Sequence, residues 1–231
     1  MKFLIKKDKI KLNFYTSESQ HFANVLYPRF SKEIYPNWWK NIERIEDKTT
    51  MKSCPGFVEF FRHSISIPLW KDIDITYSNK IEKIEIAGVN DSSLHHWIDM
   101  HPKEQYGDGF TNGIHLKLKN PWLATVNDST KFMLTDATWH RNRHDMFTVV
   151  PGMLEFKYQS SAHINMFLHK SPITQKIKLL AGTPIAYIVP LTDKQIDLTY
   201  SRVNYDTWSS LFNPIIKFRG SYNALKKLSK E

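Results

Sequence analysis

The sequence is poor in cysteine and glycine and has no long apolar run. It contains one cysteine, Cys54, and eight glycines among 231 residues. A single cysteine excludes a disulfide within the monomer and a cysteine-based zinc site, and it is typical of a reducing compartment. The few glycines disfavour a glycine-rich nucleotide loop. No stretch approaches ~18 consecutive apolar residues, and residues 1–11 lack a continuous apolar segment, so neither a membrane span nor a signal peptide is predicted.

The charge of the chain is positive but dispersed. The formal net charge is +9, and lysine is only mildly concentrated at residues 6–11 and 226–230. Dispersed lysine indicates a solvated surface, so nucleic-acid binding is not favoured as the main function, although the charge leaves it open. We expect a cytoplasmic protein with no membrane partner.

The segment of residues 1–48 predicts a hairpin followed by a helical lid. Apolar residues alternate with polar ones through residues 1–16, which favours a β-hairpin, and a short serine-capped helix follows. Trp38 and Trp39 then come directly after a proline and an asparagine. We interpret this pair as an aromatic lid over one end of the core, with a stacking platform for a ligand as the alternative.

Residues 57–199 predict the β-sandwich core. Short β-branched or aromatic segments recur there at turn-like spacing, and residues 72–77 and 80–86 alternate with period two. Such alternation indicates antiparallel sheet with one buried face, and the lack of a regular βαβ pattern favours a sandwich, jelly roll or barrel. The predicted strands are Phe57–Arg62, Ser64–Pro68, Asp72–Tyr77, Lys80–Ala87, Ile114–Leu118, Trp122–Val126, Lys131–Thr135, Phe147–Val150, Leu154–Tyr158, His163–Leu168, Gln175–Leu180 and Pro184–Pro190.

We therefore predict a mainly β, antiparallel β-sandwich or jelly roll with a few short peripheral helices, folded as a single domain over residues 1–231. The tail, residues 200–231, is expected to form short helices at Tyr205–Leu211 and Ser221–Leu228. Residues 88–113 lack periodicity, which predicts a long loop of functional importance. The residues predicted to be buried are Ile73, Ile75, Ile84, Ile86, Phe147, Val149, Ile164, Phe167 and Ile188.

Five stretches of the sequence form a pattern when taken in order. They are Tyr35–Lys40, Thr50–Gly56, Pro68–Ile73, Lys117–Trp122 and Ala181–Pro190. Together they resemble a family of uncharacterised proteins encoded by marine tailed phages and some bacteria. The resemblance covers most of residues 34–191 and implies a shared fold. It implies no activity and no functional residues, because the family has no established function.

A turn in the second half carries another resemblance. Val150-Pro151-Gly152 lies between predicted strands, and His163 follows on a later strand. In this respect the chain resembles the double-stranded β-helix of cupin-like proteins, in which a Pro-x-Gly turn precedes a strand with a metal-binding histidine. The residue between proline and glycine is missing here, and so are an upstream His-x-His and the His-x-Asp of iron-dependent oxygenases. These departures put the metal in doubt more than the fold.

A cluster of titratable residues lies at residues 140–145. His140 and His144 could share one face of a helical turn and, with His163 as a third imidazole, bind a divalent metal. Arg141 and Arg143 would oppose a cation at this place. The two arginines and the two neighbouring histidines could instead clamp a carboxylate or phosphate. The segment also fits an ordinary surface loop between strands, and all three interpretations stay open.

The aperiodic segment and the tryptophan pair supply further candidates. His96, His101 and Gln105 are candidate ligand-binding residues, because histidine both binds ligands and carries protons near neutral pH. A long polar loop also collects histidines by chance. Cys54 has lysine nearby, which can lower a thiol pKa, but we expect a buried and inert cysteine.

Three function classes remain. The leading hypothesis is a non-catalytic jelly-roll binding or structural protein of phage type, whose partners would be other phage or host proteins. Such a chain would act in the host cytoplasm, and association with a virion stays open. The alternatives are a cupin-like metal-dependent enzyme of the oxygenase class and a nucleic-acid-binding accessory protein. The sequence assigns no catalytic residue.

Overall fold

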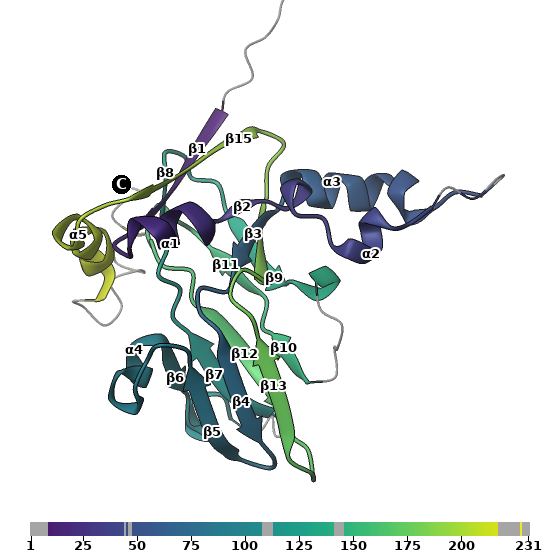
Figure 1. The fold of residues 1–231 in the computed structure, drawn as a ribbon. Coiled ribbons are helices and arrows are strands. Elements are labelled where there is room, and N and C mark those ends of the chain that lie inside the picture. Colours follow the sequence, from purple (N-terminus) through teal and green to yellow (C-terminus); the bar gives the residue numbers. More distant parts are fainter. Residues whose placement is uncertain are drawn as a thin grey trace, which may run out of the picture.

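The structure, a computed structural model, describes residues 9–43, 45, 48–107, 113–140, 146–216 and 227. Within these residues strands predominate and pair in four sheets, and every strand pair but one is antiparallel. The predicted mainly β, antiparallel class is thereby confirmed. Figure 1 shows the strands gathered in one body with helices at its margins. No helix in the described part of the chain is both long and apolar enough to cross a membrane.

Two larger sheets contain most of the predicted strands. Alternate residues turn one face of each sheet toward a common core, as the fully buried Met166 and Ile188 illustrate. The four-stranded sheet has the order β10 (Phe147–Val149), β12 (Ile164–His169), β7 (Gly113–Leu118) and β6 (Ile98–Met100). The five-stranded sheet has the order β11 (Gly152–Leu154), β9 (Phe132–Asp136), β14 (Pro184–Pro190), β3 (Ile65–Pro68) and β2 (Arg29–Phe30).

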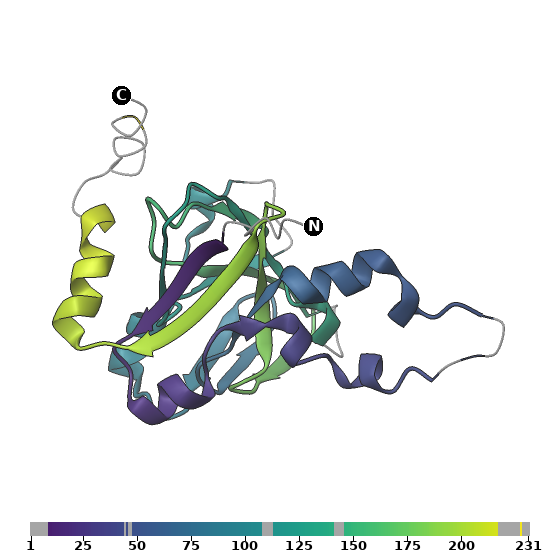
Figure 2. The same cartoon turned by 90° about the horizontal axis from the view of Figure 1, so that it is seen from above.

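A third sheet joins segments that are far apart in the sequence. β1 (Lys9–Thr16) lies between β15 (Gln195–Arg202), which runs parallel to it, and the antiparallel β8 (Leu123–Val126). Figure 2 shows β1 and β15 side by side. β1 therefore pairs with these two strands and not with a preceding hairpin strand, and residues 1–8 lie outside the described residues. Alternation had indicated a strand correctly, but it carries no information about the partner strand.

The fourth sheet completes the core. Its order is β13 (Gln175–Leu179), β4 (Ile73–Tyr77) and β5 (Ile81–Ile86), all antiparallel. All nine residues that the sequence predicted to be buried are buried. The period-two segments thus form strands whose apolar face packs inward.

Two short helices project from the β body beside each other, on the right of Figure 1: α2 (Asn37–Lys40) and α3 (Pro55–His63). The strand predicted at Phe57–Arg62 is wrong, because these residues belong to α3. Pro55 occupies the first turn, where its missing N–H is harmless, and Ser64 N donates to the Phe60 carbonyl at the helix end. The predicted serine cap is confirmed for α1 (Gln20–Val25), which begins after Ser19.

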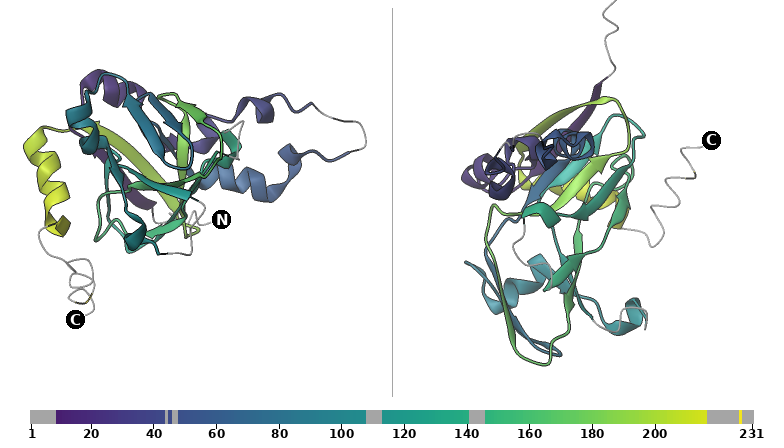
Figure 3. Two further views of the ribbon diagram at one scale, coloured as in Figure 1. Left: turned by 90° about the horizontal axis from the view of Figure 1, so that it is seen from below. Right: turned by 90° about the vertical axis from the view of Figure 1, so that its right-hand side faces the viewer.

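The segment predicted as a long loop contains regular structure. Residues 88–113 include α4 (Leu94–Trp97), the short strand β6 and the 3-10 helix η4 (Lys103–Gln105). These elements are too short to show a period in the sequence. The strand predicted at Leu154–Tyr158 is wrong, because β11 ends at Leu154 and the residues after it form a turn in which Tyr158 N donates to the Glu155 carbonyl. Figure 3 shows α5 (Tyr205–Ile216) on the side of the molecule opposite α2 and α3.

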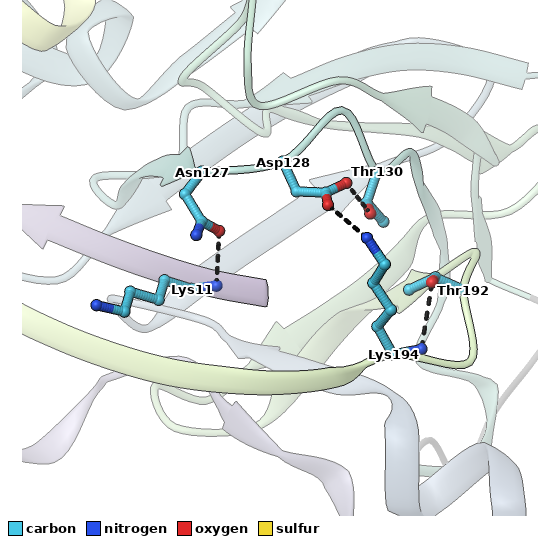
Figure 4. A network of polar contacts seen from close by, with 6 residues as sticks. All are labelled: Lys11, Asn127, Asp128, Thr130, Thr192 and Lys194. Atoms are coloured by element: carbon cyan, nitrogen blue, oxygen red, sulfur yellow. Dashed lines mark hydrogen bonds and ion pairs between the residues drawn. The ribbon is translucent and has the colours of Figure 1, made fainter. Parts of the chain in front are cut away.

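Polar contacts fix the turn between β8 and β9. Lys11 N donates to Asn127 Oδ1 over 2.8 Å, and Lys194 Nζ lies 2.9 Å from Asp128 Oδ2. Thr130 Oγ1 donates to the other oxygen of Asp128 over 2.7 Å. As Figure 4 shows, this network ties the turn both to β1 and to the turn that precedes β15. The turn thereby connects the β1 sheet to the five-stranded sheet.

Candidate binding site

The structure distributes the predicted site residues over three places. Arg141, Arg143 and His144 lie outside the described residues. Trp38, Trp39 and His140 lie near α2 and α3, His96 and His163 line a pocket beside α5, and His101 with Gln105 lies near the turn between β4 and β5.

His140 is held by protein groups on both ring nitrogens. Its Nε2 lies 2.8 Å from the Ile34 carbonyl oxygen, and its Nδ1 lies 2.6 Å from the Tyr187 hydroxyl. Because a carbonyl only accepts, Nε2 carries the proton and Nδ1 accepts the Tyr187 O–H. Burial lowers the pKa of His140 and raises the pKa of Tyr187, so both groups stay neutral. A metal at His140 would have to displace these bonds.

Trp39 packs inside an aromatic cluster that anchors α2 and α3. Only 6% of Trp39 is exposed, and its ring lies 5.7 Å from Tyr35 and 5.0 Å from Phe61. Trp38 is 39% exposed, and its Nε1 donates to the Trp139 carbonyl over 2.7 Å. Trp39 is therefore buried, but the rings that cover it come from α3 and Tyr35, and the packing of a tryptophan against the sandwich stays a prediction.

The face of the four-stranded sheet that is turned away from the core carries three polar residues and one phenylalanine. Lys117 pairs with Asn165 across β7 and β12, and His115 pairs with Phe167. Their alternate neighbours in both strands are buried leucine, isoleucine and methionine, so these four residues form what we call the outer face. His163, just before β12, continues the same alternation. It therefore lies on the outer face, whereas a cupin-like metal histidine points into the barrel.

A pocket of about 540 Å³ lies between the outer face and α5, and we call it the α5 pocket. Both α4 and α5 contribute to it, and Figure 1 shows these helices on the same side of the molecule. Cationic, acidic and aromatic side chains meet there, which is a composition suited to a polar small molecule. The residues that line it are Ser17, Glu18, His96, Trp97, Asp99, Lys117, Lys119, Asn120, Pro121, His163, Tyr205, Trp208 and Ser209.

The charges of the α5 pocket are unequally compensated. Lys119 Nζ lies 2.9 Å from Asp99 Oδ1 and donates to the His95 carbonyl over 2.6 Å. Lys117 has no ion-pair partner among the residues that the structure describes. Burial, followed by the charges of Lys117 and Lys119, lowers the pKa of His163 to about 4. The pocket therefore presents the Lys117 ammonium outside any ion pair, the Glu18 carboxylate and a neutral imidazole.

Asn120 was not among the residues predicted from the sequence. It is only 3% exposed, and its Oδ1 accepts the backbone N–H of Trp122 over 3.1 Å. Its Nδ2 is buried without a hydrogen-bond partner within the described ranges, and Asn120 itself lines the α5 pocket. A buried donor left unbonded costs about 1–3 kcal/mol. The Asn-Pro-Trp order is the sequence signal for its position, because asparagine side chains bond to backbone two residues ahead.

A second pocket, of about 510 Å³, lies at the β4–β5 turn, and we call it the hairpin pocket. Its wall includes His101, whose Nδ1 is hydrogen-bonded to Gln105 Oε1. The His101 ring meets the ring of His115 edge to face, with centroids 4.6 Å apart. His115 was not predicted, because a single histidine in an alternating strand carries no local signal.

The remaining sequence predictions concern cysteine and metal. Cys54 was expected to be buried, but it is exposed. It immediately precedes α3, where that helix begins in solvent. Across the residues that the structure describes, no three His, Cys, Asp or Glu side chains gather in a way that could hold a metal ion. A scan against models of known protein families finds no match, and neither does a search of curated proteins.

Proposed function

We propose that the protein is a non-catalytic binding protein whose α5 pocket takes a small anion that carries a planar ring. The observation that carries this proposal is the Asn120 Nδ2 donor. It is buried in the pocket wall and has no partner within the described part of the chain. Because buried donors are almost always bonded, an acceptor from outside the chain accounts for it best.

Two hydrogen-bond donors of the pocket favour an anionic acceptor. The ammonium of Lys117 and the amide of Asn120 line the same cavity, and together they can bond to a carboxylate or phosphate. Asp99 does not neutralise Lys117 fully, because its carboxylate already contacts Lys119. Glu18 and Asp99 match the two lysines of the lining in number, so a bound anion would be held by these two donors and not by a net charge of the pocket.

The aromatic walls favour a ring on the ligand. Trp97 comes from α4 and Trp208 from α5, and both line the cavity. Trp208 is fixed by a bond from its Nε1 to the Pro121 carbonyl over 3.2 Å, and its ring stacks on Tyr205. A fixed indole offers a large apolar surface at little entropic cost.

The protonation state of the pocket supports binding over catalysis. General acid–base catalysis works best when the pKa of the catalytic group lies near the working pH. His163, with a pKa of about 4, would be a weak base at neutral pH. Its role in the proposal is to accept or donate a hydrogen bond as a neutral ring.

The finer architecture belongs to the same proposal. We propose a jelly-roll-like sandwich in which the four- and five-stranded sheets face each other, supported by the single buried cluster to which both contribute. We also retain the relationship to the phage family. Two of the stretches that carry it are bonded together, since Leu69 N donates to the Thr183 carbonyl and Gly182 N to the Leu69 carbonyl, each over 2.8 Å. Such a pairing is what a shared fold requires.

The test is calorimetric titration with adenosine 5′-monophosphate, benzoate and the neutral nucleoside cytidine as probes. We expect an anionic probe to bind and Asn120→Asp to weaken it more than about tenfold, equal to about 1.4 kcal/mol. The substitution keeps the oxygen that caps Trp122 and replaces only the pocket donor. Lys117→Gln should act likewise, whereas Lys176→Gln, with the same charge loss on β13, should not. The proposal would be overturned if Asn120→Asp left the affinity for the anionic probe unchanged, or if neither anion bound.

A further inference from the structure

The hairpin pocket contains a buried imidazole that the proposed function does not use. His115 lies in β7, is only 9% exposed, and its ring packs 4.9 Å from the ring of Phe167. Its Nδ1 is buried and has no hydrogen-bond partner among the described residues. A buried ring nitrogen is costly unless something bonds to it. The pocket wall is where such a partner would lie, because His115 lines it.

Three lysines converge on the same pocket from separate elements. Lys80 comes from the β4–β5 turn, Lys103 from η4, and Lys170 follows β12. Among the described residues of the wall there is no carboxylate beside Lys80 and Lys170, whereas Lys103 has a contact of its own. Exposed lysines are ordinary on a protein surface, but their convergence on a buried imidazole nitrogen is specific to this pocket. Combined positive charge and a buried hydrogen-bonding group suit a small oxyanion.

We propose that the hairpin pocket is a second ligand site, which takes a small doubly charged oxyanion of the phosphate type, either free or as a monoester. The lysines supply charge, and His115 Nδ1 supplies the hydrogen bond nearest the core. His101 stands beside it with its Nδ1 bonded to Gln105 Oε1; since that oxygen only accepts, the Nε2 of His101 is left for the pocket. This site shares no lining residue with the α5 pocket.

Binding at this site takes up a proton. The groups that face His115 are His101 after β6, Tyr106 after η4, Phe167 in β12 and Lys117 in β7. Burial, then the charges of His101 and Lys117, lowers the pKa of His115 to about 4 in the protein alone. A dianion beside the ring opposes these effects and raises that pKa. Affinity should therefore rise as the pH falls from about 7 to about 5, by up to about tenfold per pH unit.

The experiment is calorimetric titration of the full chain with sulfate, which stays a dianion throughout this pH range. Any proton taken up then belongs to the protein. Lys80→Gln combined with Lys170→Gln should weaken binding more than about tenfold. The control is the double variant Lys176→Gln and Lys178→Gln, which removes two charges on β13 outside the pocket. It should weaken sulfate binding less than about twofold. Equal weakening by the two pairs would show a general charge effect and overturn the site.

Nitrogen-15 NMR of the histidine rings gives a readout that does not depend on a folded variant. Sulfate should shift the His115 signals and leave those of the exposed His21 unchanged. The proposal would be overturned if the chemical shifts of His115 did not change at saturating sulfate. Inorganic phosphate and glycerol 3-phosphate should also bind, and the tighter of the two identifies a free or an esterified ligand. Failure of both phosphates would overturn it, and Asn120→Asp, which alters only the α5 pocket, should change none of these results.

Discussion

Buried polar side chains are treated differently on the two sides of the molecule. Beside α2 and α3, His140 has a protein partner on each nitrogen. On the outer face and at the edge of the α5 pocket, His115 and Asn120 each keep a buried nitrogen with no partner in the described residues. The residue types are similar, but both nitrogens of His140 are bonded within the chain, whereas His115 and Asn120 each have an unbonded nitrogen; we call the two places the complete and the incomplete region for this reason. Completeness of hydrogen bonding, more than residue type, separates scaffold from candidate site.

The sharpest test of the complete region is Trp39→Ala. It should lower the free energy of unfolding by about 3–5 kcal/mol, because it leaves a cavity at the centre of the aromatic cluster. Trp38→Ala, at a position 39% exposed, should cost less than half as much. Urea denaturation followed by circular dichroism measures both. Equal losses would contradict the central place given to Trp39.

Acid should weaken the incomplete region first. The folded-state pKa of both His115 and His163 is about 4, below the value of about 6.5 for an unfolded histidine. The unfolded chain therefore takes up protons first, and stability present above about pH 6.5 is lost as the pH falls toward about 4. Each histidine should remove up to about 2 kcal/mol between about pH 6.5 and 5.

Urea denaturation at stepped pH measures this decline. His163→Gln should flatten it, whereas His21→Gln, at an exposed position on α1, should leave its slope unchanged. If the slope is the same in His163→Gln and the unaltered protein, the low pKa assigned to that ring is wrong.

Tyr187→Phe should remove one hydrogen bond from the complete region. The change removes the O–H that bonds to His140 Nδ1 and leaves that nitrogen buried without a donor. We expect a loss of about 1–2 kcal/mol in the free energy of unfolding. Tyr205→Phe, at a mostly exposed hydroxyl, serves as the control and should change it by less than about 0.5 kcal/mol. A negligible loss in Tyr187→Phe would mean that water replaces the hydroxyl.

The smallest effect is expected in the surface network that belongs to neither region. Hydrogen bonds from Lys194 and Thr130 lower the pKa of Asp128. The Lys194–Asp128 pair is partly exposed, so Asp128→Asn should cost less than about 1 kcal/mol. Because salt screens such pairs, the difference should shrink further at high ionic strength. Thermal unfolding at two salt concentrations measures it, and an effect that persists in high salt would contradict this view.

Strands with one wet face were the most predictable part of the fold. β4 and β5 bury alternate residues, and that one-sided burial is visible in the sequence as period two. α3 was misread because aromatic residues favour strands. Pro55 and the four-residue spacing of Phe57 and Phe61 were the helix signals. β15 was not predicted because most of its residues are exposed, and its stability comes from β1.

The candidate site was predictable only in fragments. His96 and His163 were proposed on separate grounds, and only the fold brings them into one pocket. Asn120 and His115 carry no local pattern that marks a site. Their importance lies in what surrounds them after folding, namely burial and an unbonded nitrogen. Sequence patterns report the face on which a residue lies, but they do not report whether its hydrogen bonds are satisfied.

The pairing of β1 with β15 has a consequence for how the chain folds. Thr199 Oγ1 donates to Asn13 Oδ1 across 186 residues of sequence. Contacts of such separation form slowly, because chain entropy must be lost before the pairing can compensate for it. The pairing of β1 is therefore completed only once β15 has been synthesised. A chain that stops before Gln195 leaves one edge of β1 open to strands of other molecules. Interrupted synthesis should consequently yield aggregates that are still rich in β-structure.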